Sequence, residues 1–249
     1  MTPRCNIMEY KAIRAVYDDD TVRVYQAYCP AIAEEAIRLG TFGSRFKLTR
    51  MTWIKPSFLW AMYRSGWATK ENQERILAID IKRDAFDYLV KNAIASSYSE
   101  DMGISRPEWQ QQILTSDIRV QFDPERDIHG NPLDYRSIQI GIRGDAVRKF
   151  VSDWIVRIQD ITDYVTDLRI RKEHGEDITP LLPPEKLYPN ESKKMLMSEK
   201  EFREKLKADG HTEEAIASAV KLYWKAQEIG IDVTEHYHEY FGKITIFRD

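Results

Sequence analysis

Alternation of apolar and polar residues predicts strands in several parts of the first two thirds of the chain. Successive side chains on a strand point to opposite faces, so an apolar residue at every second position indicates a strand with one buried face. This pattern occupies residues 75–82, 118–122 and 135–142. Residues 10–28 are predicted to form a hairpin, because two runs rich in Val, Ile and Tyr flank an acidic turn at 18–20.

Apolar residues at helical spacing predict helices between these strands. Pro30 opens a helix that Gly40 ends, and a second helix covers residues 56–65, between a short strand at 51–55 and Gly66. Proline suits the first helical turn, and glycine suits the left-handed residue after the last turn. Strands and helices do not alternate regularly, so the pattern favours an α+β fold with a mixed, mostly antiparallel sheet over a doubly wound fold.

A change in composition predicts a domain boundary near residue 190. Four prolines lie between residues 175 and 192, where the chain is expected to be extended. We therefore assign residues 1–190 to a main α+β domain and residues 191–249 to a helical C-terminal extension. The extension is too short to bury a large core of its own, so it is expected to dock on the main domain.

Composition narrows the class of protein. Hydrophobic residues make up 43% of the chain and charged residues 31%, values typical of a soluble globular protein. No apolar run approaches the length of a membrane span, and the first residues lack the apolar core of a signal peptide, so a cytoplasmic protein without membrane contact is expected. The net charge of −3 weighs against a protein that coats nucleic acid by bulk electrostatics.

Residues 51–67 form the most unusual segment of the chain. They contain three of the six tryptophans, and they also contain Lys55, Tyr63 and Arg64. Polar groups that emerge from an aromatic body are typical of pockets for flat or anionic ligands, and Trp53 is the ring expected to stack on such a ligand. The alternative is that the aromatic rings belong to the hydrophobic core, which does not account for the two basic residues.

A second set of candidate residues lies on two predicted strands. Polar groups on strands that face the interior must be satisfied by partners or used in function. The set comprises Arg23, Tyr25 and Gln26 on one strand, and Arg136, Ser137 and Gln139 on the other. The alternative is a structural polar network that holds the sheet together.

Standard catalytic and phosphate-binding motifs are missing from the sequence. Neither a Gly-x-Gly-x-x-Gly nor a Walker-type glycine loop occurs, and no cluster of residues has the spacing of metal ligands, so no metal site is predicted. Asp123 and Glu125 have the residue type of general acids, but Asp-Pro-Glu at the end of a strand is also ordinary turn chemistry. We expect them to belong to a turn that covers residues 123–133.

Several sequence blocks resemble an uncharacterised family, domain-of-unknown-function family 4291. The blocks are residues 23–28, 51–67, 79–81, 121–126 and 135–141, and the end of the family is similar to Leu187-Tyr188-Pro189. The resemblance covers residues 9–190, and residues after 191 look like an addition. The family name implies no activity.

A weaker resemblance links the chain to the ADP-ribosyltransferase superfamily, which includes RNA 2'-phosphotransferases. The similar features are Arg23 and Tyr25 on an early strand, the following helix that ends near Gly40, and the late strand with Gln139. The resemblance implies the fold of that superfamily and a catalytic position at residue 139. Family members have Glu there, and the neutral amide of Gln139 does not supply the negative charge that stabilises an oxocarbenium-like centre.

The expected function is nucleotide binding, with transfer from NAD or to a phosphorylated RNA end as the reaction that the resemblance implies. NAD is then the candidate cofactor. Arg23, Lys55 and Arg136 are expected to neutralise phosphates, Trp53 or Tyr25 to stack on a ring, and Ser137 and Gln139 to hold a ribose. The alternative is a non-enzymatic module whose polar strands are structural and whose C-terminal extension recruits a protein partner.

Overall fold

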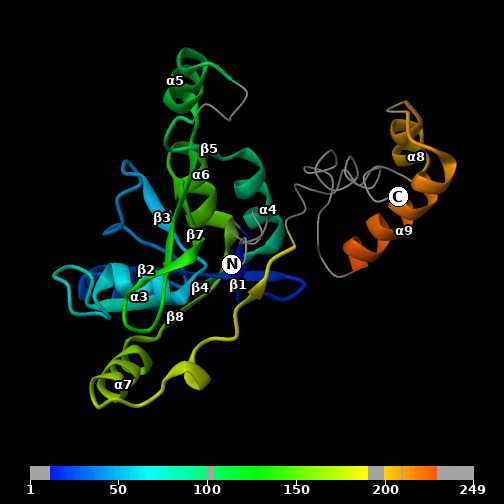
Figure 1. Cartoon of the computed structure of the whole chain (residues 1–249). Coiled ribbons are helices and arrows are strands. Elements are labelled where there is room, and N and C mark those ends of the chain that lie inside the picture. The colour runs from blue at the N-terminus through cyan, green and yellow to red at the C-terminus, as the bar shows by residue number, and fades with distance from the viewer. Residues whose placement is uncertain (1–11, 100–103, 190–198, 209, 229–249) are drawn as a thin grey trace. The chain divides into compact units, whose positions relative to one another are not determined.

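The structure is a computed structural model that describes residues 12–99, 104–189, 199–208 and 210–228 (Figure 1). It divides into two compact units, residues 1–188 and 189–249. Each unit is described by itself. The docking of the C-terminal part on the main domain stays a prediction.

The first unit contains strands and helices in mixed order. Its strands are β1 (Arg14–Ala15), β2 (Thr21–Tyr28), β3 (Thr52–Ile54), β4 (Arg75–Lys82), β5 (Ile94–Ala95), β6 (Ile118–Arg126), β7 (Pro132–Ile142), β8 (Ile155–Asp160) and β9 (Lys186–Leu187). Its helices are α2 (Pro30–Leu39), α3 (Phe58–Ser65), α4 (Arg83–Asn92), α5 (Arg106–Thr115), α6 (Gly144–Lys149), which continues as a π-helical turn (Phe150–Trp154), and α7 (Thr162–Glu173).

The strands form three sheets with the orders β2-β4-β8, β3-β7-β6-β5 and β1-β9. Every pair is antiparallel except β5 with β6. In Figure 1, β2 and β4 run across the view, while the β6–β7 hairpin runs steeply past them. The expected α+β class with mostly antiparallel sheets is confirmed.

Two expectations about the strands need correction. The predicted hairpin is formed only next to its acidic turn, where Tyr17 and Val22 form a bridge, and the preceding strand β1 pairs with β9. The turn expected over 123–133 is shorter, since β6 continues to Arg126 and β7 begins at Pro132. A register shift between Pro124 and Arg126 lets the proline lie within the strand.

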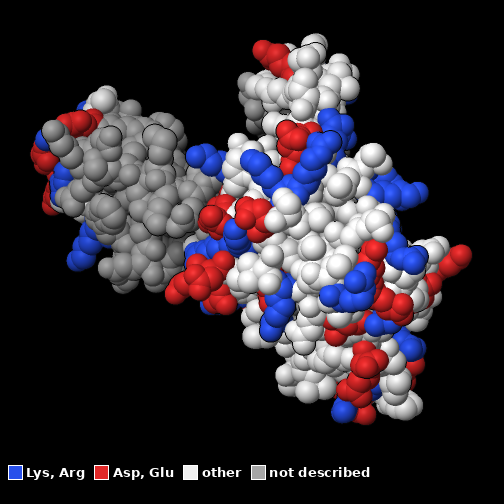
Figure 2. Space-filling view, turned by 180° about the vertical axis from the view of Figure 1, so that it is seen from behind, with Lys and Arg blue, Asp and Glu red and all other residues white. Residues whose placement is uncertain are grey.

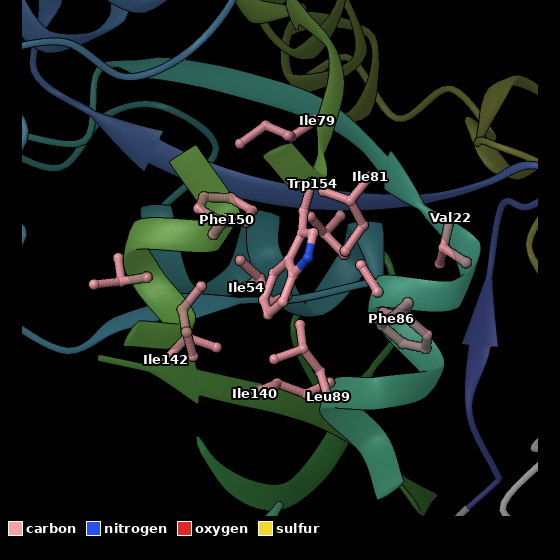
Figure 3. Close-up of a cluster of buried hydrophobic side chains, with 14 of the residues drawn as sticks. Val22, Ile54, Ile79, Ile81, Phe86, Leu89, Ile140, Ile142, Phe150 and Trp154 are labelled. Atoms are coloured by element: carbon pink, nitrogen blue, oxygen red, sulfur yellow. The ribbon is translucent and has the colours of Figure 1, made fainter. Parts of the chain in front are cut away.

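The main hydrophobic core lies between the two larger sheets and is closed by α4 and by the π-helical turn (Figure 3). The predicted alternation is confirmed here: Leu77, Ile79 and Ile81 of β4 are fully buried, as are Ile140 and Ile142 of β7. Phe86 and Leu89 of α4 and Phe150 and Trp154 of the π-helical turn complete this core, in the view of Figure 3.

The opposite face of the β2-β4-β8 sheet carries a second hydrophobic cluster. Tyr25 and Ile76 pack there against Phe58 and Met62 of α3 and against Val165 of α7. Helix α3 therefore packs on this face of the sheet, and it also contacts β6 of the other large sheet. An isolated bridge between Tyr25 and Lys55, in which the Tyr25 amide donates to the Lys55 carbonyl at 2.7 Å, joins this sheet to the chain leaving β3.

The second unit contributes two described helices, α8 (Glu199–Ala208) and α9 (Glu213–Glu228). Leu206 of α8 and Ile216, Ala219 and Val220 of α9 are buried. Among the described residues of both units, no helix is both long enough and apolar enough to cross a bilayer.

Candidate functional site

An open cleft of about 780 Å³ lies where the two larger sheets meet, a size suited to a small organic ligand. Its walls come from β2, β3, α3 and the β6–β7 hairpin, with further residues before β3 and after α3. The polar and aromatic residues that line it are Tyr25, Gln26, Tyr28, Arg50, Thr52, Trp53, Lys55, Trp60, Tyr63, Arg64, Lys70, Gln73, Gln121, Asp123, Arg126 and Gln139.

Local chemistry fixes the two ends of α3, which carries Trp60, Tyr63 and Arg64 into this wall. Ser57 caps the helix, and its hydroxyl accepts a hydrogen bond from the Trp60 amide at 3.1 Å. Gly66 ends the helix in the left-handed conformation, with φ of 61°. Trp67 and Ala68 continue in that conformation, which side chains other than glycine rarely adopt.

Trp53 lies on a glycine of the neighbouring strand. Its register partner on β7 is Gly141. A Cβ atom at Gly141 would come within 3.0 Å of the Trp53 ring and 2.7 Å of the Met51 sulfur, so both side chains would have to shift to accommodate it. The missing side chain therefore makes room for the indole ring at the cleft.

The charges in the cleft are strongly unequal. Five basic side chains line it, those of Arg50, Lys55, Arg64, Lys70 and Arg126, against the single carboxylate of Asp123. Basic and acidic side chains are interspersed over the surface of the first unit that is shown in Figure 2. A local excess of cations over a chain with net charge −3 indicates a site for an anionic ligand.

Arg126 places a guanidinium group above the ring of Tyr63, with 4.1 Å between the guanidinium carbon and the ring centroid. Its Nη1 donates to the Gly130 carbonyl at 3.2 Å, while its Nε is buried without a partner. A buried donor without a partner is costly unless a ligand satisfies it.

Gln26 has a buried hydrogen-bond acceptor without a partner, its Oε1. Its Nε2 donates to the Thr52 hydroxyl at 2.7 Å and to the Trp53 carbonyl at 3.1 Å, so the side chain is held in one orientation. Its Oε1 has no partner, although the residue is only 5% exposed. Both this oxygen and Arg126 Nε belong to residues that line the cleft, and neither is satisfied within the protein.

Lys55 lies near the ring of Trp60 in the lining of the cleft. Its Nζ donates to the Trp53 carbonyl at 3.3 Å and lies 5.6 Å from the centroid of the Trp60 ring. Burial, together with the nearby positive charge of Arg64, lowers the pKa of Lys55 to about 8, and the charge of Asp123 opposes this only in part. About half of this amine is therefore neutral at pH 8, and about a tenth at pH 7.

Asp123 is a site residue that sequence reasoning assigned to a turn. Its carboxylate accepts hydrogen bonds from Gln139 Nε2 at 2.6 Å and from Gln121 Nε2 at 2.8 Å. Gln121 and Gln139 are register partners on β6 and β7, so both amides lie on the same face as Asp123. Continued alternation through residue 123 was the signal for this face, and the following proline obscured it.

The structure brings together seven of the ten predicted site residues, namely Tyr25, Gln26, Trp53, Lys55, Tyr63, Arg64 and Gln139. Arg23, Arg136 and Ser137 do not line the cleft. Arg23 forms a two-bond ion pair with Asp80, at 2.7 and 3.0 Å, and Arg157 binds the same carboxylate. Arg136 donates to the Phe122 carbonyl at 2.9 Å, and the hydroxyl of Ser137 hydrogen-bonds Glu125.

No group of three or more metal-ligating side chains occurs among the residues that the structure describes. The pair His236 and His238, which would point in different directions on a helix, lies outside those residues. The polar groups that line the cleft are mainly basic side chains, amides and aromatic residues.

A family model described as "Domain of unknown function (DUF4291)" matches residues 12–188. No curated protein is similar enough to match the chain. The matched range contains every residue that lines the cleft. The candidate site is therefore built entirely from the part of the chain that the family shares.

Proposed function

The chain belongs to the domain of unknown function family DUF4291, whose name states no activity, and we propose from the geometry of the cleft that the protein binds a nucleotide. The observation that carries this proposal is the meeting of five basic side chains with aromatic rings around one open space of about 780 Å³. Phosphates favour arginine donors, and bases favour flat rings.

Each part of a nucleotide has a matching part of the cleft. Arg64, Lys70 and Arg126 supply donors for phosphate oxygens, and Trp53 offers a partly buried ring for stacking. Tyr25 is only 1% exposed and packs edge-on against Phe58, so it supports the wall and leaves stacking to Trp53. The unpartnered Oε1 of Gln26 is an acceptor for a ribose hydroxyl.

We extend the proposal to a transfer reaction of the ADP-ribosyltransferase type, with NAD or a phosphorylated RNA end as the substrate. Support comes from the early strand β2 at the cleft, from α2 that follows it, and from the late strand β7 with Gln139. The amide of Gln139 cannot supply negative charge, but Asp123 is hydrogen-bonded to it. Asp123 is thus the group proposed to stabilise a developing oxocarbenium centre.

A non-enzymatic role remains the second candidate for part of the predicted set. Arg23, Asp80 and Arg157 form an ion-pair network across β2, β4 and β8, away from the cleft. This network links three strands of one sheet and gives Arg23 a structural role that requires no ligand. The alternative function therefore predicts that the cleft binds no nucleotide at all.

Isothermal titration of the full chain with NAD, and separately with RNA that carries a terminal phosphate, tests the proposal. We expect binding of at least one of them, and at least about a tenfold loss of affinity in Arg64→Ala. Arg148→Ala is the matched control, because Arg148 is an exposed arginine on α6 that does not line the cleft. Lack of binding by either ligand to the folded protein would overturn the proposal.

A further inference from the structure

Lys55 has weaker hydrogen-bonding partners than two other lysines, Lys70 in the cleft and Lys82 outside it. Lys70 donates to the Arg64 carbonyl at 2.6 Å, and Lys82, outside the cleft, is paired with Asp153 at 2.6 Å. Lys55 has only the longer bond to the Trp53 carbonyl, at 3.3 Å, and in the described part of the chain it forms no ion pair with a carboxylate. Its amine is therefore weakly held and faces the cleft.

The surroundings of Lys55 are those that make an amine nucleophilic. The amine lies near the Trp60 ring, and Arg64 is near enough for its charge to act on it. Burial and a neighbouring cation both favour the neutral form of a lysine, and a neutral amine attacks carbonyl carbon. The charge of Asp123 also acts on Lys55, in the opposite direction to that of Arg64.

We propose that Lys55 forms an imine with the aldehyde group of a phosphorylated ligand, such as the open-chain form of a phosphorylated sugar. The neutral amine adds to the carbonyl carbon to give a carbinolamine, and a proton passes from nitrogen to the carbonyl oxygen. Water then leaves, and a carbon–nitrogen double bond joins the ligand to Lys55. The reaction consumes one amine and one aldehyde, releases one water, and requires no oxidant or reductant.

The phosphate part of this inference rests on the proposed nucleotide function, since Arg64, Lys70 and Arg126 would hold the ligand's phosphate beside the amine. The covalent part rests on Lys55 alone. A phosphorylated aldehyde can bind the three basic side chains through its phosphate and react with Lys55 through its aldehyde, whereas an aldehyde without phosphate can only react with Lys55. This difference makes the two parts separable by experiment.

The test treats the full chain with pyridoxal 5'-phosphate at about pH 8, near the pKa of Lys55, and then reduces any imine with borohydride. Pyridoxal without the phosphate is the matched probe. Peptide mass spectrometry identifies the labelled lysines and compares Lys55 with Lys82. Lys55→Arg and Lys82→Arg are treated in parallel, and a further sample contains excess NAD.

We expect Lys55 to carry at least about tenfold more label than Lys82, and to lose most of it when the probe lacks phosphate. Lys55→Arg should abolish this label, and Lys82→Arg should leave it unchanged. Even labelling of surface lysines, or labelling of Lys70 in place of Lys55, would overturn the inference. Mapping the label on the unaltered protein keeps this test valid even if Lys55→Arg fails to fold.

The NAD sample separates the two proposals. If NAD binds in titration but Lys55 takes no label, the imine inference fails and the nucleotide function stands. If Lys55 takes label strongly but neither NAD nor the RNA with a terminal phosphate binds in titration, the nucleotide function fails and the inference of a reactive amine stands. Protection of Lys55 by NAD supports both.

Discussion

At the scale of single residues, two glutamates near the start of α3 have raised pKa values. Glu185 accepts a hydrogen bond from the Phe58 amide at 2.6 Å, at the first turn of α3. Burial, with a smaller contribution from nearby Glu125, raises the pKa of Glu185 to about 8. Burial also raises the pKa of Glu125. Glu185 is therefore largely protonated near pH 7.

These raised pKa values predict that stability falls as pH rises from about 4.5 toward about 8. In this range the unfolded chain releases the Glu185 proton while the folded chain retains it, so deprotonation favours unfolding. The slope from one such group is at most about 1.4 kcal/mol per pH unit. Glu185→Gln keeps an acceptor for the Phe58 amide and cannot ionise, so it should flatten the profile.

Chemical denaturation at pH values across this range measures the effect. Glu185→Gln should gain stability relative to the unaltered protein at the alkaline end and little at the acidic end. Glu71→Gln, at an exposed residue, is the control and should follow the unaltered protein. Parallel profiles for the protein and Glu185→Gln would show that Glu185 ionises normally.

Arg23 gives the second prediction at this scale. Burial alone would raise the pKa of Asp80, but Arg23 and Arg157 outweigh it and lower that pKa, so the carboxylate is ionised and needs both partners. Arg23→Ala should destabilise the fold by about 2 kcal/mol. It should leave ligand affinity unchanged, because Arg23 does not line the cleft.

Urea denaturation and ligand titration of Arg23→Ala test both statements. If Arg23→Ala keeps its stability but loses ligand binding, Arg23 belongs to the binding site, as the sequence indicated. Retained binding with lower stability would establish its structural role.

Residues within one local motif were predictable as site residues, and residues that depend on distant pairing were not. Lys55, Tyr63 and Arg64 belong to a continuous segment whose aromatic density is visible in the sequence. The partner of Arg23 is 57 residues away in the chain, so the sequence did not reveal that the arginine is already paired. Asp123 was missed because its role depends on the register of β6 with β7.

At the scale of elements, helix ends were predictable because their chemistry is local. Pro30, Gly40 and Gly66 mark ends of α2 and α3, as expected. The start of α3 was placed two residues too early, because Ser57 and not Pro56 provides the cap, and the helix begins at Phe58. The capping box of Ser105 and Glu108 is formed at the start of α5. The pairing of β1 with β9 was missed, because it joins the two ends of the family domain and two-residue strands leave no periodic pattern.

The pairing of β3 with β7 gives a prediction about Gly141. Gly141→Ala would place a methyl group against the Trp53 ring and the Met51 sulfur. We expect a loss of about 1–3 kcal/mol in stability from this overpacking, and weaker ligand binding because the ring is displaced.

A double-mutant cycle with Trp53→Phe isolates this contact. The smaller ring does not reach as far over residue 141, so Gly141→Ala should cost less stability in the Trp53→Phe background. Equal costs in the two backgrounds would mean that the alanine acts through the Met51 sulfur or the strand backbone, and that Gly141 does not position the ring.

At the scale of the whole molecule, the cleft exists because two antiparallel sheets are joined near Tyr25 and Lys55. The shared core fixes the sheets to each other, and α3 packs on one of them and lines the opening. Four of the five basic groups come from residues 50–70, and Arg126 joins them from the distant β6–β7 hairpin. The tertiary fold also brings Gln26, Asp123 and Gln139 to the same cleft, which no single segment of the sequence contains.

The most direct test of this account is a crystal structure of the protein grown with NAD at saturating concentration. We predict electron density for phosphate groups beside Arg64, Lys70 and Arg126, a flat ring against Trp53, and a ribose within reach of Gln26 and Asp123. Density for NAD at another surface, with the cleft filled only by water, would contradict the account.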